Sequence, residues 1–114
     1  MRLVSLLMFI GLAGCSSLPK MSDRPTLRLS GVQTVSATSD CIADHLASRS
    51  IPNERLRLDS KQEFRFRLDN VLRDTANVST IAGTTQVALY EDGPLWKNRE
   101  QIRAIVQSCA SGAL

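Results

Sequence analysis

The residues with the most reactive side chains are three cysteines and a single histidine: Cys15, Cys41, Cys109 and His45. Thiolate and imidazole groups are typical zinc ligands, but a zinc site needs three or four of them. The chain has only one histidine, and the cysteines have other expected roles, given below. The sequence therefore predicts no metal site and no cofactor.

The histidine could instead act as the base of a hydrolase, because serine and aspartate are plentiful. However, the sequence has no Gly-x-Ser-x-Gly motif, which presents a nucleophilic serine on a sharp turn. Asp40 and Asp44 share one side of a predicted helix, and this spacing is common on a solvated face. We expect His45 to be a half-exposed helix residue and the protein not to be an enzyme.

A second cluster consists of arginines at alternate positions in two neighbouring segments: Arg55, Arg57, Arg65 and Arg67. Guanidinium groups bind phosphate and carboxylate through paired hydrogen bonds. If both segments are strands in matching register, the four side chains lie on one sheet face and form a candidate binding surface for an anionic ligand. Interleaved acidic residues offer another explanation, because opposite charges across strands stabilise a sheet without any ligand.

Length and charge limit the remaining classes of partner. The chain has 114 residues, and its 14 basic and 11 acidic residues give a net charge of +3. This length suits one domain at most. Domains that bind nucleic acid carry clustered basic residues, so a balance this small predicts no nucleic-acid partner.

Residues 1–14 are arranged like a secretory signal. One basic residue, Arg2, precedes a mostly apolar run that ends in small residues. The run is shorter than the roughly 20 apolar residues that span a bilayer. We therefore expect a cleaved signal peptide and not a transmembrane helix.

The end of this segment, Leu12-Ala13-Gly14-Cys15, resembles the lipobox of bacterial lipoproteins. The resemblance implies that Cys15 receives a diacylglyceryl group and that the chain is cut before it. In this family an aspartate after the cysteine favours retention at the inner membrane. Ser16 stands there instead, which implies an outer-membrane protein that faces the periplasm. An ordinary secretory signal with an incidental cysteine is the alternative.

The resemblance divides the chain into three parts. Residues 1–14 form the signal peptide, residues 15–26 the lipidated cysteine and a flexible tether, and residues 27–114 a small domain. The tether is polar and contains two prolines. Its extended reach is about 35–40 Å, so the domain would lie close to the membrane that holds the lipid.

If Cys15 is lipidated, Cys41 and Cys109 remain, and both fall on predicted helices near the two ends of the domain. Disulfides persist in the oxidising periplasm. We therefore predict a Cys41–Cys109 bridge that links the first helix to the last. Two buried free thiols are the alternative.

Hydrophobic periodicity predicts helices at residues 37–50 and 95–110, the first capped by Ser36, Thr38 or Ser39. The β-branched residues between positions 75 and 91 predict two strands joined by a hairpin at Ala82-Gly83. With the segments that carry the arginines, the expected fold is α+β: an N-terminal helix, three or four short antiparallel strands and a C-terminal helix.

Two interpretations compete at residues 61–75. Strict alternation at residues 63–69 favours a strand, as it does at residues 55–59. A helix is the rival, because Ser60 and Glu63 have the spacing of a capping box. A helix would leave Phe66 off the apolar stripe, so we favour the strand.

The element order and the cysteine pair are similar to those of a broad set of small proteobacterial lipoproteins. The matching features are Cys41 on the first helix, Gly83 in a hairpin before Tyr90, and a final Val106-x-x-Cys109. The resemblance covers residues 40–110 and implies an architecture, but no activity.

These observations predict a membrane-anchored envelope lipoprotein with a non-enzymatic binding or structural role. Beside the membrane itself, the expected partner is an envelope protein or an anionic envelope component. Two alternatives stay open. One is an accessory subunit of a secretion, conjugation or surface-assembly complex, and the other is a cell-wall hydrolase or hydrolase inhibitor.

Overall fold

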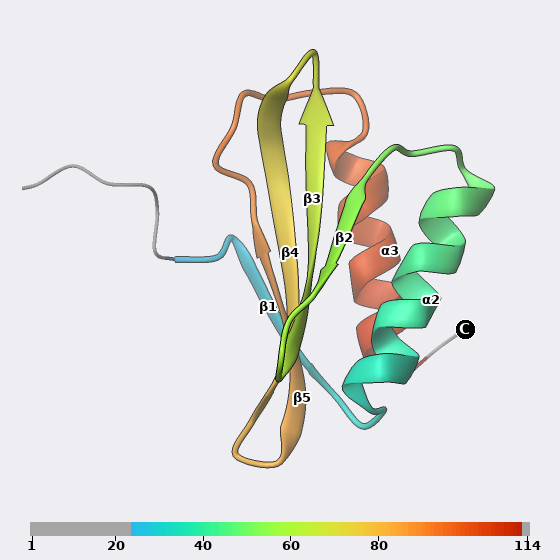
Figure 1. The fold of residues 1–114 in the computed structure, drawn as a ribbon, viewed down its shortest axis with the longest axis vertical. Coiled ribbons are helices and arrows are strands. Elements are labelled where there is room, and N and C mark those ends of the chain that lie inside the picture. The colour runs from blue at the N-terminus through green and yellow to red at the C-terminus, as the bar shows by residue number, and fades with distance from the viewer. Residues whose placement is uncertain (1–23, 113–114) are drawn as a thin grey trace, which may run out of the picture.

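The computed structural model describes residues 24–112, which form an antiparallel sheet with both helices on one face (Figure 1). Along the chain the elements are β1 (Leu27–Gly31), α2 (Val35–Ser48), β2 (Glu54–Arg57), β3 (Lys61–Leu68), β4 (Val71–Ile81), β5 (Thr84–Tyr90) and α3 (Arg99–Ser111). The strands lie in the order β1-β5-β4-β3-β2. The α+β class is confirmed, but the expected count of three or four strands is wrong, because the sheet has five.

The first strand, β1, is the one that the sequence did not predict. It has only five residues, in which the half-buried Leu27 and Leu29 alternate with exposed positions. Leu27 lies opposite Leu89 and Leu29 opposite Val87 on β5. A strand this short at a sheet edge depends on a partner that is about 60 residues away, so its local pattern is weak.

The strand expected at residues 63–69 is confirmed as β3, and the helical alternative is wrong. Phe64 and Phe66 are both fully buried on the face covered by the helices. In a strand, residues two positions apart point to the same face, so both side chains enter the core. In a helix, the two side chains would point to different sides. Asp69 and Asn70 then form the turn into β4, and both have the positive φ that a tight hairpin requires.

The hairpin predicted at Ala82-Gly83 is also confirmed, with φ angles of 53° and 80° at these two residues. The strand before it, β4, begins at Val71 and is longer than expected. A register shift between Phe66 and Arg67 of β3 lets the two long strands stay paired to the turn.

Both predicted helices are present, with different starting points. Thr34 caps α2, since its hydroxyl accepts a hydrogen bond of 3.0 Å from the backbone N–H of Ala37. The expected caps all lie inside the helix instead, and Thr38 and Ser39 are buried against the sheet. The start of α3 was expected at residue 95, but the helix begins at Arg99. Leu95 is therefore 79% exposed instead of facing the core.

Where β1 meets α3, the backbones come very close. A Cβ atom added to Gly31 would lie 2.2 Å from the carbonyl oxygen of Ala110. Glycine is therefore required at this position for steric reasons. The contact fixes the last turn of α3 against the edge of the sheet.

Candidate functional site

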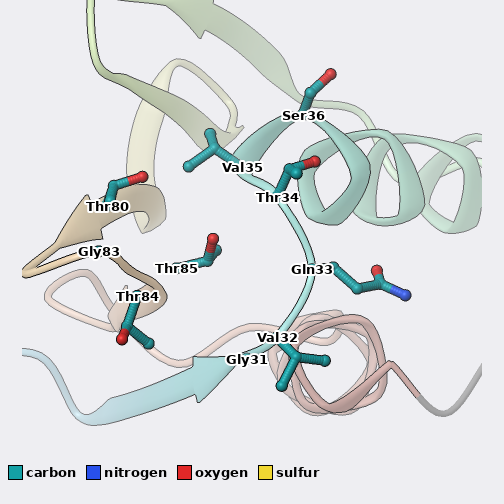
Figure 2. A pocket seen from close by; sticks show the side chains of 10 residues that line it. All are labelled: Gly31, Val32, Gln33, Thr34, Val35, Ser36, Thr80, Gly83, Thr84 and Thr85. Carbon is teal, nitrogen blue, oxygen red and sulfur yellow. The ribbon is translucent and has the colours of Figure 1, made fainter.

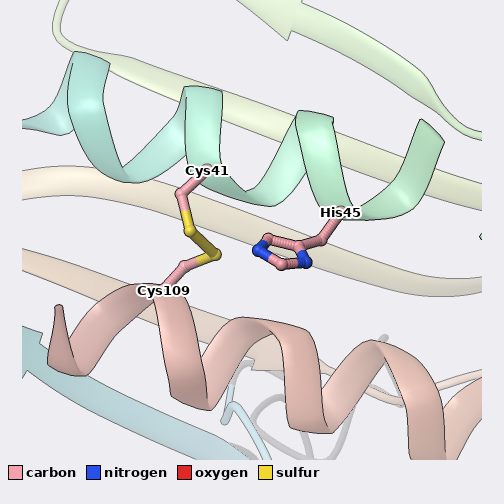
Figure 3. A group of neighbouring side chains, drawn as sticks. All are labelled: Cys41, His45 and Cys109. Atoms are coloured by element: carbon pink, nitrogen blue, oxygen red, sulfur yellow. A yellow bond between two sulfur atoms is a disulfide. The ribbon is translucent and has the colours of Figure 1, made fainter. Parts of the chain in front are cut away.

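The predicted disulfide is present and joins the two helices (Figure 3). The sulfur atoms of Cys41 and Cys109 are 2.08 Å apart, and the two Cα atoms are 5.7 Å apart. Cys109 is fully buried and Cys41 is half-buried. Cys15, the predicted lipidation site, lies outside the described residues.

His45 lies beside this disulfide (Figure 3), with its ring and both sulfurs within 4.8 Å of one another. A bonded pair of sulfurs offers no thiolate, so the trio lacks the usual soft ligands for a metal ion. Arg49, one turn along α2, places its Nη1 atom 3.1 Å from His45 Nδ1. As expected, His45 is half-buried. It borders a cavity of about 280 Å³ between the helices.

The four arginines expected on one sheet face are divided between the two faces, so that prediction is wrong. In the observed register, Arg55 lies opposite Phe64, which points into the core. Directly opposed residues share a face, so Arg55 and Arg57 lie on the helix side. Arg65 and Arg67 lie on the uncovered side, because their positions alternate with the buried phenylalanines. Both strands were predicted correctly, but their register differs by one position from the one that would place all four arginines on one face. The expected binding surface is therefore absent.

Three of these arginines have acidic partners within the protein. Arg55 donates to Asp40 on α2 at 2.8 Å and lies over the ring of Phe64. Arg67 donates to Glu54 at 2.6 Å. Arg65 pairs with Glu63, and this hydrogen bond raises the pKa of Arg65. The charge pattern is therefore mostly explained by pairing within the sheet and to α2.

The most buried ionic group is one that no sequence motif indicated, Asp74 on β4. Its side chain is fully buried, and it accepts a 2.7 Å hydrogen bond from Arg99 at the start of α3. The indole N–H of Trp96 donates to its second oxygen at 3.0 Å. The sequence nevertheless contains an indication of its burial, because Asp74 alternates with the apolar Ala76 and Val78 and shares their face of the sheet. A charge at such a position requires a partner.

A second ion pair joins the middle of α3 to the end of β5. Arg103 donates to Glu91, whose side chain is 5% exposed, and Thr26 donates to the same carboxylate at 2.8 Å. Burial alone would raise the pKa of Glu91. The hydrogen bonds from Arg103 and Thr26, together with the positive charges of Arg103 and Arg99, outweigh burial, and the pKa of Glu91 lies below its ordinary value.

A sizeable cavity lies at the N-terminus of α2 (Figure 2). Its volume is about 630 Å³, and it lies between the β1–α2 connection and the β4–β5 hairpin. Its lining is rich in hydroxyl groups, from Thr34, Ser36, Thr80, Thr84 and Thr85. No sequence motif pointed to it, because its walls come from two segments that lie far apart in the sequence.

No protein-family model matches this chain, and comparison with curated proteins and with solved structures finds no match either. Within residues 24–112, no helix is long and apolar enough to cross a membrane. Function must therefore be inferred from the residues themselves.

The described side chains divide into satisfied and unsatisfied groups. The charged network around Asp74 and the disulfide both have complete sets of partners, which is typical of structural roles. The buried side-chain atoms without a partner belong to Thr38, Ser39, Arg73 and Asn77, none of which lines the hydroxyl-rich cavity. The cavity differs because, apart from that of Thr34, its hydroxyl groups are open and make no hydrogen bond within residues 24–112. It is the best candidate for ligand binding.

Proposed function

We propose that this protein is a lipoprotein of the bacterial envelope, attached to the outer membrane through acyl chains on Cys15. Its role is to bind or to support another envelope component, and not to catalyse a reaction. The observation that carries the proposal is the pairing of cysteines. Cys41 and Cys109 are joined to each other, so Cys15 is the one cysteine of the three that remains for modification.

The disulfide supports the same compartment. Disulfides are rare in the reducing bacterial cytosol and common in the periplasm. The bridge lies between two helices with Cys109 fully buried, as expected of a stable structural bond. A domain facing the periplasm would form this bond during export.

The anchor would hold the domain near the bilayer. A single acyl chain binds a membrane weakly, whereas two or more hold it firmly, and lipidation at Cys15 supplies at least two. The first described strand begins at Leu27, at most about 40–43 Å of extended chain from Cys15. Partners within the envelope layer next to that membrane are therefore within reach.

The test is metabolic labelling with a fatty-acid analogue, combined with membrane fractionation. The Cys15→Ser variant should lose the label and remain uncut at this site. The matched Ser16→Asp variant should keep the label but move from the outer to the inner membrane. Unchanged labelling of the Cys15→Ser protein would refute the anchor, and unchanged location of the Ser16→Asp protein would refute the outer-membrane assignment.

A further inference from the structure

We propose that the cavity at the N-terminus of α2 binds a carboxylate group, carried by a small acid or by the C-terminus of a peptide. This site goes beyond the envelope role above and does not depend on lipidation of Cys15. It rests on two independent features that line the cavity: free backbone donors on α2 and the open hydroxyl of Thr85, a largely buried residue of β5.

The first wall is the start of α2. Of its first four backbone N–H groups, that of Ala37 donates to the Thr34 side chain and that of Thr38 to the Thr34 carbonyl. The N–H groups of Val35 and Ser36 make no hydrogen bond within the described chain. Free N–H groups and the helix dipole together make a helix N-terminus favourable for an anion. The first turn contains no acidic residue that would occupy this position.

The second wall is Thr85 on β5, on the face of the sheet covered by the helices. Thr85 is only 7% exposed, and its hydroxyl makes no hydrogen bond within residues 24–112. Figure 2 shows this side chain in the middle of the cavity, with its oxygen directed toward the helix. The hydroxyl oxygen is open to the cavity that Thr85 lines and is not enclosed by protein atoms. It is therefore free to donate a hydrogen bond to a ligand oxygen.

The charges around the cavity favour a single negative charge on the ligand. None of the described residues that line it is charged. The adjoining cavity of about 320 Å³ includes Lys61 and Asp59, whose charges are opposite. Doubly charged phosphate groups are usually held by arginine or lysine side chains. An uncharged set of hydroxyl and amide donors suits a carboxylate better.

The size of the cavity indicates that the ligand has a body beyond the carboxylate. A volume of about 630 Å³ is far larger than this group needs. Gly31 and Gly83 contribute no side chain, and Val32 is 95% exposed at the rim. The valine and the threonine methyl groups would contact an apolar part of a small acid or of a peptide.

The binding test is an NMR titration of the full chain in detergent micelles. Acetate, an acetylated dialanine with a free C-terminus, its C-terminal amide and sulfate are added in parallel. We expect acetate and the free-acid peptide to shift the amide signals of Val35 and Ser36, and the amidated peptide to bind at least tenfold more weakly. A peptide that binds more tightly than acetate identifies a peptide C-terminus, and equal binding identifies a small acid. Equal binding of acid and amide, or shifts with sulfate alone, would overturn the proposal.

Variants locate the binding site. Thr85→Val removes the hydroxyl at nearly constant volume and should weaken binding of the free-acid peptide about tenfold, the value of one hydrogen bond to a charged group. Thr75→Val makes the same change on the uncovered face of the sheet and should bind like the original protein.

A proline at position 35 tests the helix end independently of Thr85. Proline is favoured at the first position of a helix, and the preceding Thr34 has the extended conformation that proline requires, with ψ of 164°. Val35→Pro removes one free N–H and should also weaken binding. If Thr85→Val fails to fold, Val35→Pro decides alone. Full affinity in the folded variants would overturn the site.

Discussion

The two ends of α3 are held by different kinds of bond. At its first residue, Arg99 forms a buried ion pair with Asp74 in the middle of the sheet. Near its last turn, Cys109 forms a disulfide with α2, and Ala110 packs against Gly31 of β1. One end is thus fixed to the sheet by charge and the other to a neighbouring helix by a covalent bond.

The difference matters because the two bonds stabilise the protein in different ways. A buried ion pair stabilises the protein only while both partners are present, since a lone buried charge costs free energy. A disulfide acts largely by restricting the unfolded chain, so its loss need not disturb the native packing. Damage to the first end should therefore loosen the native structure itself, whereas damage to the second should lower the free energy of unfolding with little structural change.

The largest effect is expected from Asp74→Ala, which leaves the Arg99 guanidinium buried without its partner. We expect the free energy of unfolding to fall by about 3–5 kcal/mol, as for other broken buried pairs. Urea unfolding followed by circular dichroism measures it. Asp40→Ala, which breaks the more exposed pair with Arg55, is the matched control and should cost less than about 1 kcal/mol. Similar losses in the two variants would contradict the comparison.

The disulfide end is tested by replacing Cys41 and Cys109 with alanine together. The expected loss is about 2–4 kcal/mol, because the bridge closes a long loop in the unfolded chain. Dithiothreitol should destabilise the original protein by a similar amount and leave the double variant unaffected. Joined Cys41 and Cys109 peptides in non-reduced mass spectrometry would verify the bond directly. Full alkylation of both thiols without reductant would refute it.

Gly31→Ala sharpens the comparison at the disulfide end. The new methyl group would overlap the Ala110 carbonyl, so β1 or the last turn of α3 must move. Overpacking of this kind costs about 1–3 kcal/mol. Gly83→Ala is a useful control, since a Cβ there meets no neighbouring atom, although its positive φ adds some strain. A lower melting temperature for Gly83→Ala than for Gly31→Ala would argue against the close contact between Gly31 and Ala110.

The smallest effect belongs to Glu91, whose pair with Arg103 lies between the two ends. Its folded pKa is lowered, so it stabilises the protein above the unfolded value of about 4.3. This contribution is lost as pH falls through the folded pKa. Glu91→Gln should therefore cost about 1 kcal/mol at pH 7 and progressively less in acid. If the difference in free energy of unfolding between Glu91→Gln and the original protein stayed constant from pH 7 to pH 3, the charge of Glu91 would not be the cause of its stabilising effect.

The amino-acid sequence is informative about one end of α3 and not about the other. Cysteines are few, so counting them is enough to point to Cys41 and Cys109. Asp74 and Arg99 are two of many charged residues, and nothing local distinguishes them. Their pairing appears only when β4 is seen to begin at Val71, which places Asp74 at an inward position.

The arginines show the same limit at the level of register. Alternation predicted both strands that carry them, because a strand exposes every second residue to the same side. Which side each strand presents depends on the pairing of Arg55 with Phe64, and a shift of one residue reverses it. Local pattern cannot fix this choice, since it is made by the turn between β2 and β3 and by the burial of the phenylalanines.

Periodicity, turn residues and cysteine number are local or countable properties, so the α+β class, the two helices, the central hairpin and the disulfide could all be predicted from the sequence. The fifth strand, the division of the arginines and the burial of Asp74 depend instead on pairing between distant segments, which is settled only when the chain folds. The cavity at α2 belongs to this second group. Its donors are ordinary threonines and backbone N–H groups, and they become a site only because the fold brings β1, α2 and the β4–β5 hairpin together.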